Sequence, residues 1–470
     1  MNTLLLIMLS LVEIGLVVLT FSENRGRATW YLNRMAANII EILAYIVFAF
    51  FPGIDYSFRF KGLLVVLIIR AIIAVVAFLV NRKRKGKMKT ARVIISAVLG
   101  IVIIAGAMLP SYMFNDYNGI APSGSYGEKT AQAILIDTTR IEEFETDGSF
   151  REVPVDFYYP DAGEDSVEKY PLVVFSHGAF GFSRSNYSLY QELVSHGYVV
   201  VSLSHPYHSF FCKDTSGNTI TVNPEFMNNT MHINDPSTSE DEIFNISSKW
   251  IELRMNDMNF AIDTLKRWQI DGDFNESWYL DGNDSNVREV MNMIDFDKIA
   301  LIGHSLGGAT AVSVGRNRTD VSAVVDLDGT MLGEQIELVD CEPYEFEGKI
   351  HNQKYICNED PYPVAILNID NDEHHHSRIA AKEVGMPYAN NAIMDNAVCG
   401  YDTYMIGAGH MNLTDLPLFS PFLADMLGTG DTDAKECITT INQLVLRFFD
   451  DKLKRKEIFT VEESYGDKNN

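Results

Sequence analysis

Four long apolar runs near the start of the chain constrain its fold more than any other feature of the sequence. They cover residues 3–21, 36–51, 63–80 and 93–109. Each approaches the roughly 17–25 residues that a helix needs to cross a bilayer, whereas runs of about 10–14 are typical of buried helices in soluble domains. We therefore expect an all-α bundle of four transmembrane helices over residues 1–111. No Lys or Arg precedes the first run, so we expect an uncleaved helix and not a signal peptide.

Charge divides the chain at the same place. Residues 1–111 carry 13 Lys and Arg against four Asp and Glu, a net of +9, whereas the rest carries 25 against 59, a net of −34. Such an acidic domain argues against a nucleic-acid partner, because phosphate backbones are neutralised by clustered Lys and Arg. It should also be repelled by anionic lipid surfaces, which favours neutral, zwitterionic or soluble partners.

The positive residues between the apolar runs predict the orientation of the bundle, because short cytoplasmic loops carry an excess of Lys and Arg. The second connection has only Arg59 and Lys61. The first and third connections together have ten: Arg25, Arg27, Arg34, Arg82, Lys83, Arg84, Lys85, Lys87, Lys89 and Arg92. We therefore expect a multi-pass protein of the cell membrane, with both termini and the acidic domain on the extracytoplasmic side.

Two ionisable residues, Glu13 and Arg70, fall inside the apolar runs. Charged groups in lipid usually face the bundle interior and have a partner, so we expect these two to pair. A packing role is favoured over transport or sensing. After the bundle, residues 112–129 are rich in Gly, Ser, Asn and Pro, which predicts a linker.

Residues 130–460 alternate short runs rich in Val and Ile with amphipathic stretches. Nearly continuous apolar strands are typical of a mostly parallel sheet with helices on both faces, so we predict an α/β fold. Residues 207–294 are polar at first and then helical from about residue 240 to 268, which suggests a cap insert. Residues 461–470 form a polar tail.

The sharpest motif is GHSLGG, residues 303–308, which follows a predicted strand and precedes a predicted helix. This is the G-x-S-x-G turn that presents a serine hydroxyl to a histidine base, so we predict that Ser305 is a nucleophile. A second turn, FSHGAFG at residues 175–181, predicts an oxyanion hole made by the backbone N–H groups of Ala179 and Leu306. We expect His177 to shape that turn.

The base and the acid should follow the serine in the chain. His410 lies in a Gly-rich loop after the last predicted strand, where the base is expected. His374, His375 and His376 are interpreted as an exposed loop cluster, with metal binding as the minor alternative. For the acid, spacing leaves two pairs of residues open. One pair is Asp326 and Asp328, and the other is Asp370 and Asp372.

The stretches YPLVVFSHG, LVSHGYVV, IDFDKIALIGHSLGGAT and LDGTMLG together resemble the platelet-activating-factor acetylhydrolase family of the plasma type, which has the α/β-hydrolase fold. The resemblance covers most of residues 130–450 and does not extend to the four apolar runs. It implies Ser305 as the nucleophile, Asp328 as the acid in an L-D motif, and His410 as the base in GAGHMN. It also implies no cofactor and no metal.

The resemblance implies a membrane-anchored serine esterase that cleaves short-acyl or lipid-derived esters through an acyl-enzyme. A general hydrolase of small esters or polyesters remains an alternative, and so does a non-catalytic membrane sensor or binding module. The segment 333–361 is longer than the family needs, and Leu306 stands where animal members tend to carry Phe.

Smaller signals concern the cysteines and the aromatic residues. An oxidising exterior permits disulfides, and Cys341 with Cys357 is the most plausible pair among five cysteines. His205 and His208 are expected in a turn. Aromatic residues that could line an acyl pocket, although cap packing is favoured for them, are Tyr207, Phe210, Phe211, Phe244 and Trp250.

Overall fold

The computed structural model describes residues 1–24, 26–50, 57–115, 117, 119–163, 167–235, 237–272, 274, 277–278, 284–346 and 348–466. Arg25 of the first predicted loop and residues 467–470 of the predicted tail lie outside these ranges. The chain forms two compact units. The helical unit contains Met1–Asn118 and Leu418–Leu423, and the globular unit contains Gly119–Pro417 and Ala424–Asn470.

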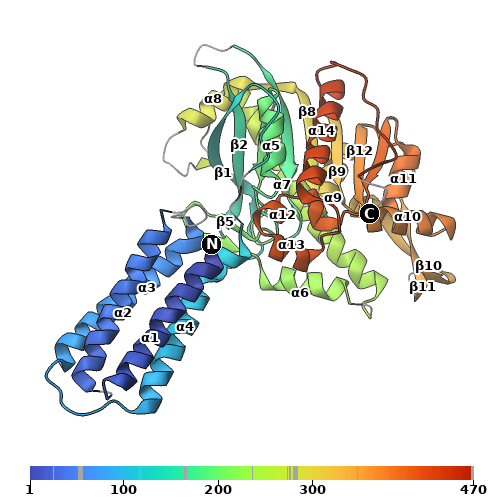
Figure 1. Cartoon of the computed structure of the whole chain (residues 1–470). Helices are drawn as coiled ribbons and strands as arrows, with labels where there is room; N and C mark the ends of the chain where they lie inside the picture. Colours follow the sequence, from blue (N-terminus) through green and yellow to red (C-terminus); the bar gives the residue numbers. More distant parts are fainter. Residues whose placement is uncertain are drawn as a thin grey trace. The chain divides into compact units, whose positions relative to one another are not determined.

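The helical unit contains α1 (Asn2–Ser22), α2 (Arg27–Phe48), α3 (Phe58–Asn81) and α4 (Thr90–Met113) (Figure 1). All four are long and apolar enough to cross a membrane. Many of their large apolar side chains are exposed, including Leu11, Val18, Ile73 and Val80. Such a surface suits hydrocarbon and is unfavourable in water. The four predicted helices are confirmed, and the apolar surface supports membrane insertion.

One prediction for this unit was wrong in detail. Arg27, Arg34, Arg59, Lys61 and Arg92 were assigned to connections, but α2 includes the first two, α3 includes Arg59 and Lys61, and α4 includes Arg92. The apolar-run criterion detects only the stretch without charges, whereas polar residues with good helix propensity extend the helix beyond it. The connection between α3 and α4 remains rich in Lys and Arg.

The predicted pairing of Glu13 with Arg70 is confirmed. The Glu13 carboxylate is fully buried and accepts hydrogen bonds from the guanidinium groups of Arg70 and Arg34. Arg70 also contacts a Glu41 carboxylate oxygen at 3.3 Å and donates to the Gly100 carbonyl at 3.2 Å. A Cβ at Gly100 would overlap the Glu13 carboxylate, so a larger residue there would displace this side chain.

The described residues of the globular unit form a ten-stranded sheet in the order β14-β13-β12-β9-β8-β3-β4-β2-β1-β7. Neighbouring strands are parallel from β14 to β4, and β2, β1 and β7 are antiparallel. The strands are β1 (Gly127–Ile141), β2 (Phe150–Asp161), β3 (Tyr170–Ser176), β4 (Val199–Leu203), β7 (Ser277–Trp278), β8 (Ile294–His304), β9 (Val321–Leu327), β12 (Ala365–Asn371), β13 (Gly400–Met405) and β14 (Ser464–Tyr465). This topology confirms the mostly parallel α/β sheet.

Alternate side chains of the central strands enter two separate cores, because successive residues of a strand point to opposite faces. Leu172 and Val174 join the core with α7, α8, α9 and α11, whereas Val173 and Phe175 join the core with α5 and α14. The bounds are α5 (Tyr187–Ser195), α7 (Glu240–Asp271), α8 (Ser285–Met293), α9 (Leu306–Asn317), α11 (Ala389–Asn396) and α14 (Ala434–Lys452) (Figure 1). Helices therefore cover both faces, as predicted.

The predicted cap, residues 207–294, divides into two parts. Its first part forms β5 (Phe211–Lys213), β6 (Thr219–Thr221) and α6 (Pro224–Ile233). A capping box of Ser239 and Glu242 then begins α7, and Gly272 ends it at a φ of 64°. Apolar residues of α7 and α8 pack in the first core, so this part covers the sheet.

The remaining described elements include α10 (Asp372–Glu383), α12 (Leu416–Phe419), α13 (Pro421–Leu427) and a hairpin of β10 (Gln335–Phe346) and β11 (Lys349–Cys357). The hairpin contradicts the predicted disulfide. Cys357 pairs with Gln335 at one end, whereas Cys341 follows Asp340, which pairs with Gln353. All five cysteines are free. The strand β1 begins at Gly127, inside the predicted linker, and β14 lies inside the predicted tail.

Candidate active site

Ser305 occupies the sharp turn between β8 and α9. Its backbone has φ 55° and ψ −127°, a conformation that L-residues rarely adopt. The turn is tight: a Cβ at Gly303 would overlap the Gly307 carbonyl, and a Cβ at Gly307 would overlap the Ser176 carbonyl. The glycines therefore permit the strand, the turn and the helix to pack closely, and the Ser305 side chain is left partly exposed.

Asp328 and His410 lie in direct contact. Asp328 follows β9, with φ 57°, and its carboxylate is 2.5 Å from Nδ1 of His410. Asn371 donates to the same carboxylate from its backbone N–H at 2.8 Å and from its side-chain amide at 2.5 Å. Burial alone would raise the pKa of Asp328, but its hydrogen bonds with His374 and His410 lower the pKa well below its usual range.

His410 is the open member of this arrangement. Its side chain is 37% exposed, compared with 1% for Asp328. His304 packs beside it, with ring centroids 4.5 Å apart, and Nε2 of His304 lies 3.1 Å from the His410 carbonyl. Among the described residues, none forms a hydrogen bond with the Ser305 hydroxyl. Such catalytic hydrogen bonds are often long without substrate and shorten in the reacting complex.

The other candidate acids have different partners. Arg378 donates to Asp370, the Gly329 N–H donates to Asp326 at 3.0 Å, and the Gly407 N–H donates to Asp372 at 3.0 Å. Burial raises the pKa of Asp326 well above its usual range and also raises that of Asp370. Of the four carboxylates left open by the sequence, Asp328 is therefore the one in contact with His410.

The expectation of an exposed loop for the three adjacent histidines was wrong. They lie in α10, and His374 is 11% exposed with Nδ1 3.0 Å from Asp328. Asp328, Asp370 and His374 offer atoms within 4.8 Å of one another, close enough to hold a metal ion. However, Arg378 already donates to Asp370. The positive guanidinium at this position disfavours binding of a metal cation. The absence of a metal remains a prediction.

The predicted oxyanion turn lies beside the nucleophile. A Cβ at Gly178 would be 3.2 Å from Cβ of Ser305. Ala179 and Leu306 pack in one small apolar cluster. His177 is fully buried, with Nε2 2.7 Å from the Ser209 hydroxyl and Nδ1 2.7 Å from the Gly178 carbonyl. This agrees with a role in shaping the turn.

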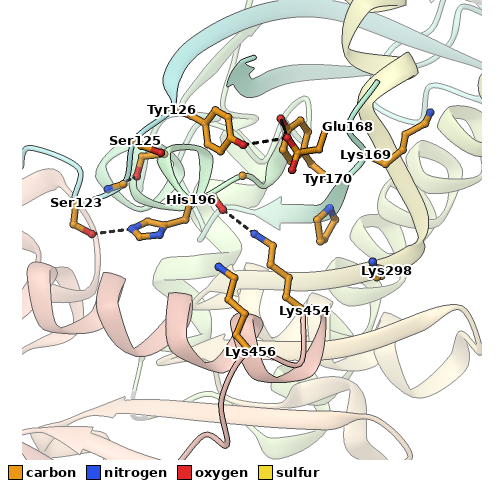
Figure 2. Close-up of a pocket in the computed structure, with 14 residues that line it drawn as sticks. Ser123, Ser125, Tyr126, Glu168, Lys169, Tyr170, His196, Lys298, Lys454 and Lys456 are labelled. Carbon is orange, nitrogen blue, oxygen red and sulfur yellow. Dashed lines mark hydrogen bonds between the residues drawn. The ribbon is translucent and has the colours of Figure 1, made fainter. Parts of the chain in front are cut away.

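Two pockets lie at different edges of the sheet. A pocket of about 400 Å³ is lined by His410, Asn371 and His376 together with Gly-rich loops. A pocket of about 650 Å³ lies where β3 and β4 begin (Figure 2), whereas Ser305 follows the carboxyl end of β8, at the other end of the parallel strands. Two of its lysines have partners: Lys454 donates to the His196 carbonyl at 2.7 Å (Figure 2), and Lys298 pairs with Asp295 at 2.9 Å. The larger pocket shares no lining residue with the pocket at His410, so it is separate from the candidate site.

Sequence reasoning did not identify His304, Asn371 or Asn412 as site residues. Asn412 accepts hydrogen bonds from the Gly409 and Gly430 N–H groups at 2.9 and 2.8 Å, which fixes the loop that carries His410. Asn412 lies two residues after His410, and this closeness in the sequence could have indicated that it supports the loop of the predicted base. The predicted aromatic candidates mostly pack on other rings, such as Trp250 on Phe226 and Tyr207 on Phe144.

Comparisons with known proteins find relatives of the globular unit. Residues 151–344 match the family model described as "Platelet-activating factor acetylhydrolase, isoform II". The platelet-activating factor acetylhydrolase of Canis lupus familiaris is 30% identical over 169 residues, which are 35% of this chain and 36% of that protein. The acetylhydrolase of Bos taurus is 24% identical over 301 residues, which are 62% of this chain and 59% of that protein. The resemblance to this family is therefore confirmed.

The match has a defined extent. It includes Ala179, Ser305 and Asp328, whereas His410 lies beyond residue 344. The chain spans less than two thirds of the length of these two relatives. A solved ferulic acid esterase from Streptomyces cinnamoneus superposes with a TM-score of 0.47 at 18% identity, over 72% of this chain and 93% of that chain.

Proposed function

We propose that this protein is a membrane-anchored serine hydrolase of carboxylic acyl esters, in which Ser305, His410 and Asp328 form the catalytic triad. The observation that supports it best is the contact between Asp328 and His410 at 2.5 Å, in the same unit as the strained turn of Ser305. A buried, ionised carboxylate on Nδ1 fixes the imidazole tautomer and leaves Nε2 free to take a proton.

The reaction proceeds in two steps. The Ser305 oxygen attacks the ester carbonyl while its proton passes to Nε2 of His410, and the tetrahedral intermediate then expels the alcohol, which takes that proton. Water attacks the acyl-enzyme, with His410 again accepting the proton, and releases the acid and the free serine. The N–H groups of Ala179 and Leu306 hold the negative oxygen, and each such donor contributes about 2.7–4 kcal/mol.

For the substrate, we propose short-acyl or lipid-derived esters. The matched relatives are described as platelet-activating factor acetylhydrolases. The four apolar helices support an anchor that keeps the site near a bilayer. The strongly acidic sequence after residue 111 favours neutral or zwitterionic lipids over anionic ones.

The test uses the full chain in detergent, with nitrophenyl esters from acetyl to octanoyl and short-chain phosphatidylcholine as substrates. We expect turnover that is highest for short acyl groups and absent in Ser305→Ala. Equal turnover in wild type and Ser305→Ala would contradict the proposal. No turnover of any ester, with an intact fold, would instead favour a binding module.

We also propose that the globular unit is extracytoplasmic. The loop between α3 and α4 contains Arg82, Lys83, Arg84, Lys85, Lys87 and Lys89, which favours the cytoplasm for that loop. A topology reporter fused after the last residue should be active outside the cytoplasm. A reporter active only in the cytoplasm would reverse this orientation.

A further inference from the structure

Arg254 is a buried cation that forms no ion pair with any residue that the structure describes. It lies in α7, and its side chain is 0% exposed. Within the described residues, no carboxylate lies within ion-pair distance of its guanidinium. Burial lowers the pKa of Arg254 to about 9, so the group remains charged at neutral pH. Because an unpaired buried charge is costly, the groups that Arg254 contacts indicate what the charge does.

The guanidinium contacts the predicted oxyanion turn. Nη1 donates to the His177 carbonyl at 2.5 Å, and Nη2 donates to the Gly178 carbonyl at 3.4 Å. Nε donates to Nδ1 of His208 at 3.4 Å. Two of the three contacts therefore hold consecutive carbonyls of the FSHGAFG turn, although Arg254 lies more than 70 residues further along the chain.

The contact with Gly178 acts on the proposed oxyanion donor through a single peptide group. The Gly178 carbonyl and the Ala179 N–H belong to the same planar peptide, and in a trans peptide they point in opposite directions. The Gly178 oxygen also lies 2.7 Å from Nδ1 of His177 and accepts from the Gly181 N–H at 3.1 Å, so Arg254 adds a charged donor to an oxygen that these groups already hold, and the Ala179 N–H points away from them. The positive guanidinium beside the Gly178 oxygen also polarises the peptide, which makes the Ala179 N–H a stronger donor.

We propose that Arg254 is a positioning residue for the oxyanion hole: together with His177 and Gly181 it holds the Gly178–Ala179 peptide, and its charge polarises that peptide, so that the Ala179 N–H stabilises the tetrahedral intermediate on Ser305. This inference rests on the proposed function. Arg254 does not touch substrate, and its effect reaches the reacting oxygen only through the peptide.

A neighbouring arginine shows the contrast. Arg151 is also buried, but it pairs with Glu142 at 2.9 Å and with Asp257 at 2.7 Å. Asp257 in turn lies 2.9 Å from His205, whose other nitrogen lies 2.9 Å from the Ser176 hydroxyl. Arg151 therefore balances buried carboxylates, whereas the charge of Arg254 acts on the carbonyls of the turn.

The test compares Arg254→Met and Arg254→Lys with wild type in the full chain. Arg316→Met is the control, because it removes an arginine that pairs with Glu334 at 2.6 Å and does not contact the turn. Three quantities are measured: kcat and KM for nitrophenyl acetate per active site, the inhibition constant of an alkyl boronic acid that forms a tetrahedral adduct with Ser305, and the unfolding temperature.

We expect Arg254→Met to lower kcat about 10- to 100-fold, a fall no larger than the one caused by removing one oxyanion donor. KM should change by less than about 3-fold. Boronate affinity should fall by the same factor as kcat. Arg254→Lys keeps the charge but reaches only one carbonyl, so its kcat and boronate affinity should be intermediate. Arg316→Met should change neither.

The outcomes separate this inference from the proposed function. If Arg254→Met or Arg254→Lys lowers only the unfolding temperature, and the folded sites keep wild-type kcat and boronate affinity, Arg254 is merely structural and the inference is overturned. Should Arg254→Met fail to fold, Arg254→Lys decides by the same two readouts. If wild type hydrolyses no ester and Ser305→Ala behaves identically, the proposed function fails and the inference fails with it.

Discussion

Each unit of the protein buries a carboxylate among charged and polar groups, but the two clusters differ in whether they are open. In the helical unit, arginines contact both oxygens of Glu13, and this side chain is fully buried. In the globular unit, Asp328 is equally buried, but its partner His410 is 37% exposed. The first cluster is closed by arginines, whereas the second ends in an imidazole ring that reaches solvent.

The backbone differs in the same way. Ser305 and Asp328 both have positive φ values, 55° and 57°, and each such conformation costs about 1–3 kcal/mol in a non-glycine residue. Glu13 and Arg70 lie in regular helices. A buried charge alone therefore does not indicate reactivity. Strained backbone together with one open partner distinguishes the candidate active site from a cluster that holds helices together.

The largest effect should come from Ser305→Ala, which removes the proposed nucleophile and leaves the fold intact. We expect kcat for nitrophenyl acetate to fall about 10⁶-fold. Ser313→Ala is a matched control in α9, because its hydroxyl donates to the Ala309 carbonyl at 2.8 Å and lies in no proposed catalytic contact. It should keep wild-type kcat. Comparable losses in both variants would show that α9 packing, and not the nucleophile, is being measured.

The next effect separates the two buried aspartates at the ends of β9 and β12. Asp328→Asn should lower kcat about 10⁴-fold, because an amide cannot hold the imidazole of His410 in the required tautomer. Asp370→Asn leaves Arg378 partly unpaired, which should lower the free energy of unfolding by about 3 kcal/mol with kcat changed less than 10-fold. An active Asp328→Asn beside an inactive, folded Asp370→Asn would assign the acid to Asp370.

The sequence predicted the parts of the site that local rules determine. The turn of Ser305 requires a strand, glycines and a helix in close succession, and the sequence around GHSLGG shows this pattern directly. The pairing of Glu13 with Arg70 follows from the cost of isolated charges in an apolar environment. These features depend on spacing and chemistry, which a sequence contains.

Other features depend on how distant elements pack. Arg254 and His374 were not predicted as site residues, because their contacts depend on the rotation of α7 and α10 about their own axes. His374 is 46 residues from Asp328, and Arg254 is 77 residues from His177. The prediction of a disulfide was wrong for a related reason, since cysteine spacing does not show which residues a hairpin places opposite each other.

A variant of the helical unit tests the closed cluster. Arg70→Met removes one cation from Glu13 and Glu41, which should lower the stability of the helical unit by about 3 kcal/mol and leave kcat unchanged. Lys61→Met, at an exposed position of α3, is the control and should change neither. Stability is measured by circular dichroism during thermal unfolding in detergent. A lower kcat in Arg70→Met with intact helices would show that this cluster takes part in the chemistry after all.

The smallest effect concerns pH and His374. Burial alone would lower the pKa of His374, but the hydrogen bond to Asp328 and the charge of Asp370 outweigh both burial and the nearby Arg378, so the pKa is raised. A histidine whose pKa is higher in the folded chain than in the unfolded chain stabilises the fold fully below the unfolded value, about 6.5. This stabilisation is lost as pH rises through the folded value.

We therefore expect His374→Gln to lower the free energy of unfolding by about 1–2 kcal/mol at pH 5.5, and by progressively less as pH rises above 6.5. His376→Gln is the control, because His376 is 66% exposed and lies against Asp372 and the ring of Tyr404, and its effect should stay small at every pH. Urea unfolding from pH 5.5 to 9 measures both. A His374→Gln effect that does not change with pH would mean that His374 contributes packing alone and adds no positive charge beside Asp328.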